Sequence, residues 1–337
     1  MVLDSATRPA PRWLQALASL KLTLAILAVL LAATVAAIYT EAGATWLLAP
    51  PLALFAANLA CAVIANPVFR RQTALLAFHL ALIAIVLLAA LGRMTYLRGE
   101  FELTEGATFD GRLAREEAGP WHPRRLQAAA FENLGMRIEY AAGIQRGKTY
   151  NAVRWMDAAG RERTAVIGDI DPLVLHGYRF YTTPQKGFAP IFTWQPFLGP
   201  AVRGSVHLPS YPALADRQEA EWSPPGAASK LKLRLVIEDK LIDPARASEL
   251  RLPKSHRLYV KLADSERALA PGERLALPDG VLVYDGLRSW MGYMVSYDQT
   301  LPWLLSACAL AIASLAWHYW RKFAREPWLR GEGAPEA

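Results

Sequence analysis

The sequence predicts an integral membrane protein with four transmembrane α-helices and a large β-rich extracytoplasmic domain between the third and fourth helices. Three observations lead to this fold class. The chain has 337 residues, 53% of them hydrophobic, and the apolar excess lies in four blocks. The region 93–300 carries 28 basic and 25 acidic residues, so its charge is nearly balanced. The remaining basic residues flank the apolar blocks, as they do in membrane proteins.

Each apolar block is long enough to cross a bilayer, whose ~30 Å hydrocarbon core requires about 20 helical residues. The blocks are Leu22–Ile38, Trp46–Ala65, Ala74–Gly92 and Leu301–Trp320. Pro50 and Pro51 predict that the regular helix of the second block begins near them, because proline fits the first helical turn. Asn58 lies in the middle of that block and is expected to hydrogen-bond a neighbouring helix.

The flanking basic residues predict the orientation of the chain. They are Arg8, Arg12, Lys21, Arg70, Arg71, Arg321, Lys322, Arg325 and Arg330. The short loop after the first block has only Glu41 as a charged residue. The positive-inside rule therefore predicts that both termini are cytoplasmic and that residues 93–300 lie outside. Because these charges follow the spans, they do not form the folded basic face that nucleic acid requires.

The predicted organisation has five parts. They are a cytoplasmic N-terminus at 1–21, a three-span membrane region at 22–92, an extracytoplasmic β-rich domain at 93–300, a fourth transmembrane helix at 301–320 and a cytoplasmic tail at 321–337. Residues 1–37 also resemble a cleavable signal peptide, and cleavage would leave the large domain on the same side. We expect a bacterial cytoplasmic (inner) membrane; a plastid membrane is the alternative, although no transit-type leader is visible.

The region 93–300 has the pattern of antiparallel β structure. Short runs rich in β-branched and aromatic residues predict strands at Met136–Tyr140, Tyr178–Thr183, Lys230–Ile237 and Leu258–Leu262. No amphipathic helix of 10–15 residues separates them, which favours a β-sandwich or meander over a parallel α/β sheet. A proline-rich stretch at 209–229 predicts a long loop that divides the domain. The two cysteines, Cys61 and Cys308, lie in apolar blocks, so this domain contains no disulfide.

The sequence contains none of several common catalytic and cofactor motifs. Cys-x-x-Cys-His, a glycine-rich phosphate loop, Gly-x-Ser-x-Gly and His-Glu-x-x-His are all missing from it. The four histidines of the outer region are isolated from one another in sequence; they are His122, His176, His207 and His256. We therefore do not expect the chain to be an enzyme on its own.

His79, in the third apolar block, is the strongest candidate site residue. A histidine inside hydrocarbon is costly and seldom faces lipid, and its neutral imidazole is a good axial ligand for haem iron. The alternative is an interhelical hydrogen bond, to Asn58 or to a backbone carbonyl. His318 lies among aromatic residues at the end of the fourth block, where an interfacial position explains it without a ligand role. A haem site between His79 and His318 is a second, weaker hypothesis.

Four stretches in this order resemble the ResB (CcsB) family of the System II cytochrome c maturation pathway. They are Leu17–Leu24 at the first block, Ala77–Gly92 in the third, Leu97–Gly106 at the start of the outer domain and Gly292–Asp298 before the last block. The resemblance implies a membrane subunit that works with a CcsA-type protein to carry haem b across the membrane and present it to apocytochrome c. A thioredoxin-like thiol-reducing protein is a further implied partner. His79 matches the histidine that supplies one axial haem ligand, while the partner subunit supplies the other.

Two functions from different classes follow from these patterns. The first is an accessory, haem-positioning subunit of a cytochrome c–haem ligation complex. The second is a cofactor-free, membrane-anchored scaffold or binding protein for an extracytoplasmic partner, in which His79 is a packing residue. Haem in the purified complex would separate the two.

Overall fold

A computed structural model describes residues 11–40 and 44–325 of the chain. The predicted segments before residue 11 and after residue 325, with Arg8 and Arg330, lie outside the described residues, as does Glu41. The chain divides into two compact units. The helical unit contains the residues up to Tyr96, the segment Ala118–Pro123 and the residues from Asp298 onward. The β unit contains Leu97–Glu117 and Arg124–Tyr297.

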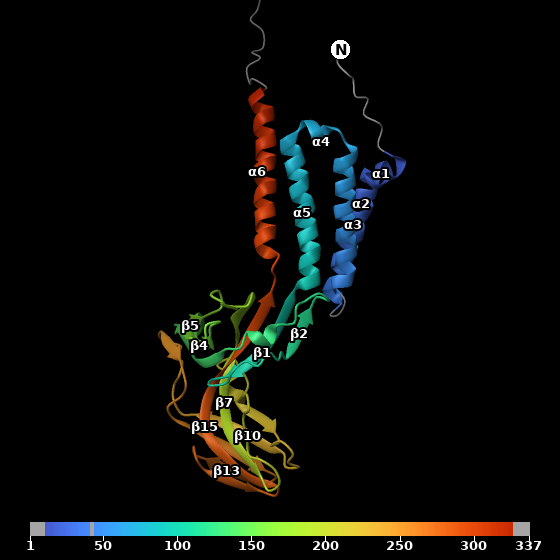
Figure 1. The fold of residues 1–337 in the computed structure, drawn as a ribbon. Coiled ribbons are helices and arrows are strands. Elements are labelled where there is room, and N and C mark those ends of the chain that lie inside the picture. Colours follow the sequence, from blue (N-terminus) through green and yellow to red (C-terminus); the bar gives the residue numbers. More distant parts are fainter. Residues whose placement is uncertain (1–10, 41–43, 326–337) are drawn as a thin grey trace, which may run out of the picture. The chain divides into compact units, whose positions relative to one another are not determined.

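Four long apolar helices dominate the helical unit, as the sequence predicts (Figure 1). They are α2 (Leu20–Tyr39), α3 (Ala44–Ala65), α5 (Thr73–Thr95) and α6 (Leu301–Arg325), with short helices at α1 (Arg12–Leu17) and α4 (Val68–Arg71). Each long helix is long and apolar enough to cross a membrane. Along the chain, α3 packs against α2 and α5, and α5 packs against α6.

Two features of the helices differ in detail from the sequence predictions. The expected start of the second helix near Pro50 and Pro51 is wrong, because α3 begins at Ala44 and contains both prolines. Proline removes an N–H donor but does not forbid a helical φ, so a helix can continue through it when its surroundings hold the backbone. The last helix continues beyond Trp320 to Arg325, because basic side chains can follow an apolar helix into the polar interface.

The β unit consists of three antiparallel sheets (Figure 1). The first has strand order β2–β1–β15–β7–β6, with β14 beside β15 and β8 beside β7. The second has order β11–β3–β4–β5, and the third β13–β12–β10–β9. The strands are β1 (Leu97–Thr104), β2 (Arg115–Ala118), β3 (Glu132–Ala141), β4 (Gln145–Met156), β5 (Glu162–Ile167), β6 (Leu173–Leu175), β7 (Tyr178–Pro196), β8 (Val202–Ser205), β9 (Glu219–Trp222), β10 (Leu231–Ile237), β11 (Ser248–Leu250), β12 (His256–Leu262), β13 (Ser265–Leu269), β14 (Arg274–Leu277) and β15 (Gly280–Tyr297).

The four predicted strands are confirmed within β3, β7, β10 and β12. The predicted loop at 209–229 is wrong in part, because it contains a 3-10 turn at Ala215–Arg217 and strand β9, which pairs with β10. The stretch nevertheless separates the strands β1–β8 from the strands β10–β15 along the chain. Alternation alone could not identify β9, since its four residues include two glutamates and only one large apolar side chain.

The antiparallel ribbon of β7 and β15 runs through both halves of the β unit. At one end the buried side chains of the ribbon, such as Trp194 and Tyr284, pack with the leucines of β10 and β12. At the other end Tyr293 stacks on Phe101 of β1, with ring centroids 5.1 Å apart, and Phe180 joins the same aromatic cluster. Burial of these apolar side chains holds the three sheets together without disulfides.

Candidate functional site

His79 lies in the second turn of α5, and its ring is half-buried. The ring packs edge-on against Phe69 of α4, with centroids 4.5 Å apart, and against Phe78, with centroids 5.4 Å apart. The short helix α4 returns the chain from α3 to α5, and this places the buried Phe69 beside the first turns of α5. His79 therefore sits in an apolar, partly enclosed position.

The hydrogen bond of His79 determines which ring nitrogen is available. Nδ1 lies 2.9 Å from the carbonyl oxygen of Leu75, one turn earlier in α5. A carbonyl can only accept a hydrogen bond, so Nδ1 carries the proton and the neutral ring leaves a lone pair on Nε2. No hydrogen bond to Nε2 is found among the described residues. Nδ1–H bonded to a carbonyl, with Nε2 available, is the arrangement that metal-bound histidines commonly show.

His79 does not lie on the face of α5 that is turned toward His318 of α6. Ala74, Ala81 and Gly92 form the face toward α6: a Cβ on Gly92 would lie 2.8 Å from Thr300 Oγ1, and Ala74 lines a cavity with His318. At 3.6 residues per turn, His79 lies about 140° around the helix from Ala74. The structure therefore does not place His79 on the side of α5 where His318 lies. A second ligand for an iron atom bound to His79 is better sought outside α6.

Asn58 forms the interhelical contacts that the sequence predicts. Only 2% of it is exposed, and its Oδ1 accepts a hydrogen bond from Thr23 Oγ1 of α2 at 2.7 Å. Its Nδ2 donates to the carbonyl of Leu17 at the end of α1. His79 bonds the Leu75 carbonyl of its own helix instead, and a bond between His79 and Asn58 is not found among the described residues.

The other four histidines outside the long helices differ in the partners of their ring nitrogens. His207 uses both nitrogens, Nδ1 with Glu102 and Nε2 with Thr104. His256 Nε2 lies 2.8 Å from Tyr284 Oη, while its Nδ1 is buried without a partner, and burial lowers the pKa of this histidine. His122 is 6% exposed with Nδ1 3.0 Å from the Thr95 carbonyl, and His176 is exposed in a turn. His256 thus also has a ring nitrogen without a partner, but that nitrogen is buried, whereas the half-buried ring of His79 leaves Nε2 unbonded beside two phenylalanine rings.

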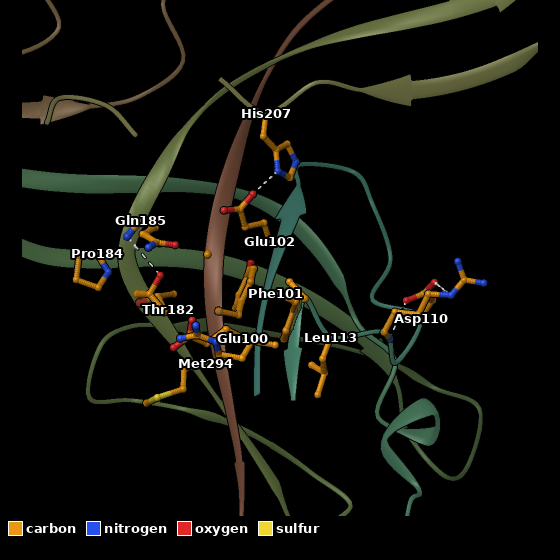
Figure 2. Close-up of a pocket in the computed structure, with 16 residues that line it drawn as sticks. Glu100, Phe101, Glu102, Asp110, Leu113, Thr182, Pro184, Gln185, His207 and Met294 are labelled. Carbon is orange, nitrogen blue, oxygen red and sulfur yellow. Dashed lines mark hydrogen bonds and ion pairs between the residues drawn. The ribbon is translucent and has the colours of Figure 1, made fainter. Parts of the chain in front are cut away.

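The β unit contains a cavity of about 960 Å³ beside β1, β7 and β15 (Figure 2). Glu100 and Glu102 of β1 project into it, and Thr182 and Gln185 of β7 line the opposite wall. The wall opens because the register of β7 and β15 shifts between Met291 and Tyr293, where three residues of β7 face one of β15. Such bulges redirect side chains and are common beside functional sites. Sequence reasoning missed this cavity.

A carboxylate, an imidazole and a hydroxyl are linked by hydrogen bonds beside this cavity, and Figure 2 shows the Glu102–His207 pair. Glu102 Oε2 is 2.7 Å from His207 Nδ1, and His207 Nε2 is 2.8 Å from Thr104 Oγ1. The imidazole also stacks on Trp290, with centroids 5.1 Å apart and ring planes 11° apart. These hydrogen bonds fix the ring of His207. Because Thr104 is only 6% exposed, its hydroxyl is not an accessible nucleophile. A glutamate and a histidine held rigidly in a cavity suit polar ligand binding.

Lys186 is the other unusual group of the β unit. It is 3% exposed, its Nζ donates to the Pro184 carbonyl at 3.1 Å, and burial lowers its pKa to about 8. It lies at the register shift of β7, where its ammonium satisfies a backbone carbonyl freed from the ladder. This contact supports the bulge that shapes the cavity wall.

Metal-binding clusters of three or more His, Cys, Asp or Glu side chains are not found in residues 11–40 and 44–325. A haem differs from such a site, since it needs only one or two axial ligands from protein. Comparison of the chain with protein-family models and with curated proteins finds no match. The candidate site therefore depends on the geometry of the chain itself, and on His79 above all.

Proposed function

We propose that this chain is a membrane subunit that binds haem through His79 and helps present it to a protein outside the membrane, as in System II cytochrome c maturation. One observation carries the proposal: His79 keeps Nε2 free in an apolar setting while its Nδ1–H is bonded to the Leu75 carbonyl. A neutral imidazole of this tautomer is the form that ligates iron. The resemblance to the ResB (CcsB) family supports the same role.

The proposal places α2, α3, α5 and α6 across a membrane, which we take to be the bacterial cytoplasmic membrane. Their length and apolar composition support this placement. Arg12 and Lys21 precede or open α2, Arg71 closes α4, and Arg321 and Lys322 lie near the end of α6. The positive-inside rule then favours cytoplasmic termini and an extracytoplasmic β unit.

In this role the residues of the chain hold and orient the cofactor. The haem iron supplies the coordination chemistry, and its vinyl groups are the part that apocytochrome c attaches to. His79 Nε2 would hold the haem iron, Leu75 would keep the His79 ring in the required tautomer, and Phe69 and Phe78 would provide apolar contact and restrict the ring. Since His318 lies on another face, a CcsA-type partner is the proposed source of the second ligand. Apocytochrome c and a thiol-reducing protein are the proposed partners of the β unit.

A second candidate function is a membrane-anchored binding protein without a cofactor. The cavity beside β1, with Glu100, Glu102 and His207 in its lining, favours it, because this cavity is large enough for a ligand or a peptide side chain. In that case His79 would only pack against Phe69 and bond its own helix.

The test is the visible absorption spectrum of the full chain, purified in detergent with a CcsA-type partner. Wild type should show a haem Soret band, His79→Ala should lose or shift it, and added imidazole should restore it by occupying the vacated ligand position. His318→Ala, as the matched control, should keep the wild-type band. An unchanged spectrum in His79→Ala would contradict the ligand role, and an intact complex without haem would favour the binding protein.

A further inference from the structure

A cavity of about 450 Å³ lies between the beginning of α5 and the end of α6. It is lined by Arg71, Gln72, Thr73, Ala74, His318, Arg321 and Lys322. These residues come from two segments of the chain about 250 positions apart, which α5 and α6 bring together by packing. Its volume falls in the range of about 300–1,000 Å³ typical of sites for small ligands.

The cavity is strongly cationic. Arg71, Arg321 and Lys322 contribute three positive charges, and no carboxylate is part of the lining. In the part of the chain that the structure describes, none of the three forms an ion pair with an acidic side chain. Positive charges gathered in one concave place repel one another until an anion enters. The positive-inside rule explains basic residues near the spans, but it does not require that two separate segments share one cavity.

Neutral donors in the same cavity complement these charges. Gln72 and Thr73 stand where α5 begins, and that helix starts without a side-chain cap. The first N–H groups of an uncapped helix and its dipole favour an anion there. The three cations and the first N–H groups of α5 thus favour an anion in the same cavity.

Aromatic residues next to the cavity indicate its depth. Three large aromatic side chains near the end of α6 are exposed: Trp317 by 50%, Tyr319 by 48% and Trp320 by 76%. Tryptophan and tyrosine in this position are typical of the boundary between hydrocarbon and headgroups. The guanidinium of Arg321 lies 5.9 Å from the centroid of the Trp317 ring, so this cation lies at the same boundary.

We propose that this cavity binds the phosphate of an anionic phospholipid headgroup from the cytoplasmic leaflet. The inference rests on the membrane placement proposed above, but it does not rest on haem. Basic pockets between membrane helices suit such headgroups, because each cation gains energy from the lipid phosphate. The lipid would then pin the ends of α5 and α6 together.

The test is native mass spectrometry of the full chain in detergent with equimolar phosphatidylglycerol and phosphatidylcholine. We expect preferential retention of phosphatidylglycerol. The double variant Arg321→Gln/Lys322→Gln should weaken that retention by about fivefold per charge removed. The matched control Arg12→Gln/Lys21→Gln removes two exposed charges at the same predicted side and should keep the preference.

Three outcomes would overturn the inference. They are equal retention of both lipids, an equal loss in the control variant, and displacement of phosphatidylglycerol by millimolar inorganic phosphate, which would indicate a site for a soluble anion. Extraction of cell membranes with alkaline carbonate separates this inference from the proposed membrane placement. A chain that stays in the membrane but shows no lipid preference contradicts only the headgroup site, whereas a chain that is extracted contradicts the placement itself.

Discussion

Replacing Tyr293 by phenylalanine should destabilise the β unit without changing its shape. Tyr293 is fully buried on β15, and its hydroxyl donates to Asn151 Oδ1 at 2.6 Å. Asn151 is also fully buried, and its Nδ2 donates to Asn133 Oδ1 at 2.7 Å and to the Gly135 carbonyl at 2.9 Å. Burial raises the pKa of Tyr293, so the hydroxyl remains a donor at ordinary pH.

The size of the effect follows from what the change leaves behind. The phenyl ring keeps its stacking on Phe101, so the apolar burial is retained. One buried hydrogen bond is lost, which costs about 1 kcal/mol. The Oδ1 of Asn151 then remains buried without a donor, and an unsatisfied acceptor of this kind costs about 1–3 kcal/mol in total. We expect the free energy of unfolding to fall by about 2 kcal/mol.

Urea unfolding of the full chain in mild detergent, followed by tryptophan fluorescence, measures this loss. Tyr181→Phe is the matched control, because Tyr181 pairs with Met294 on the adjacent register position and no hydrogen bond of its side-chain hydroxyl is found among the described residues. It should change the free energy of unfolding by less than about 0.5 kcal/mol. Equal midpoints for the two variants would refute the reasoning, because they would show that the bond to Asn151 contributes nothing.

Three further changes test other parts of the structure. Burial lowers the pKa of His256 below its usual 6.5, so the unfolded chain binds more protons than the folded chain. The free energy of unfolding should therefore fall as the pH drops through 6.5 and level off below the folded pKa. His256→Gln should reduce this pH dependence, measured as the difference between urea midpoints at pH 5 and pH 8. Gly292→Ala places a Cβ 2.5 Å from Thr183 Oγ1 and should cost about 1–3 kcal/mol, a loss that the companion change Thr183→Ala reduces in the same assay. Asn58→Leu removes two interhelical hydrogen bonds and should lower the free energy of unfolding of the helical unit in dodecyl sulfate by about 1 kcal/mol. An unchanged midpoint of the dodecyl sulfate titration would show that these two bonds are dispensable.

Sequence patterns predicted the elements whose signal is local. Four apolar blocks became four long helices because hydropathy over about 20 residues needs no knowledge of distant contacts. Strand alternation identified β10 for the same reason. The start of α3 was missed, since the tolerance of Pro50 and Pro51 depends on packing that the local sequence does not contain.

The candidate sites show the same division. His79 was recognisable as an ionisable residue in an apolar block, but its tautomer depends on the Leu75 carbonyl, and its enclosure depends on Phe69 of another helix. The cavity of the β unit depends on a register shift between β7 and β15, which lie about 100 residues apart in the chain. Glu102 of β1 and His207, which follows β8, come together because β1 pairs with β15, β15 with β7 and β7 with β8. The sequence contained one signal of the register shift, Gly292, where a glycine interrupts a strand rich in aromatic residues. The strand that pairs with it could not be inferred from the sequence.

The positions of His79 and of the cationic cavity on α5 make the two proposed sites separable. His79 lies about 140° around the helix from Ala74, which lines the cavity with Arg321 and Lys322. Sites on different helix faces without shared contacts should be energetically independent. His79→Ala should therefore leave the phosphatidylglycerol preference unchanged, and Arg321→Gln/Lys322→Gln should leave the Soret band unchanged. If the double variant also shifts the Soret band, the cations act on the haem itself, and the lipid and haem would share one site across the helix.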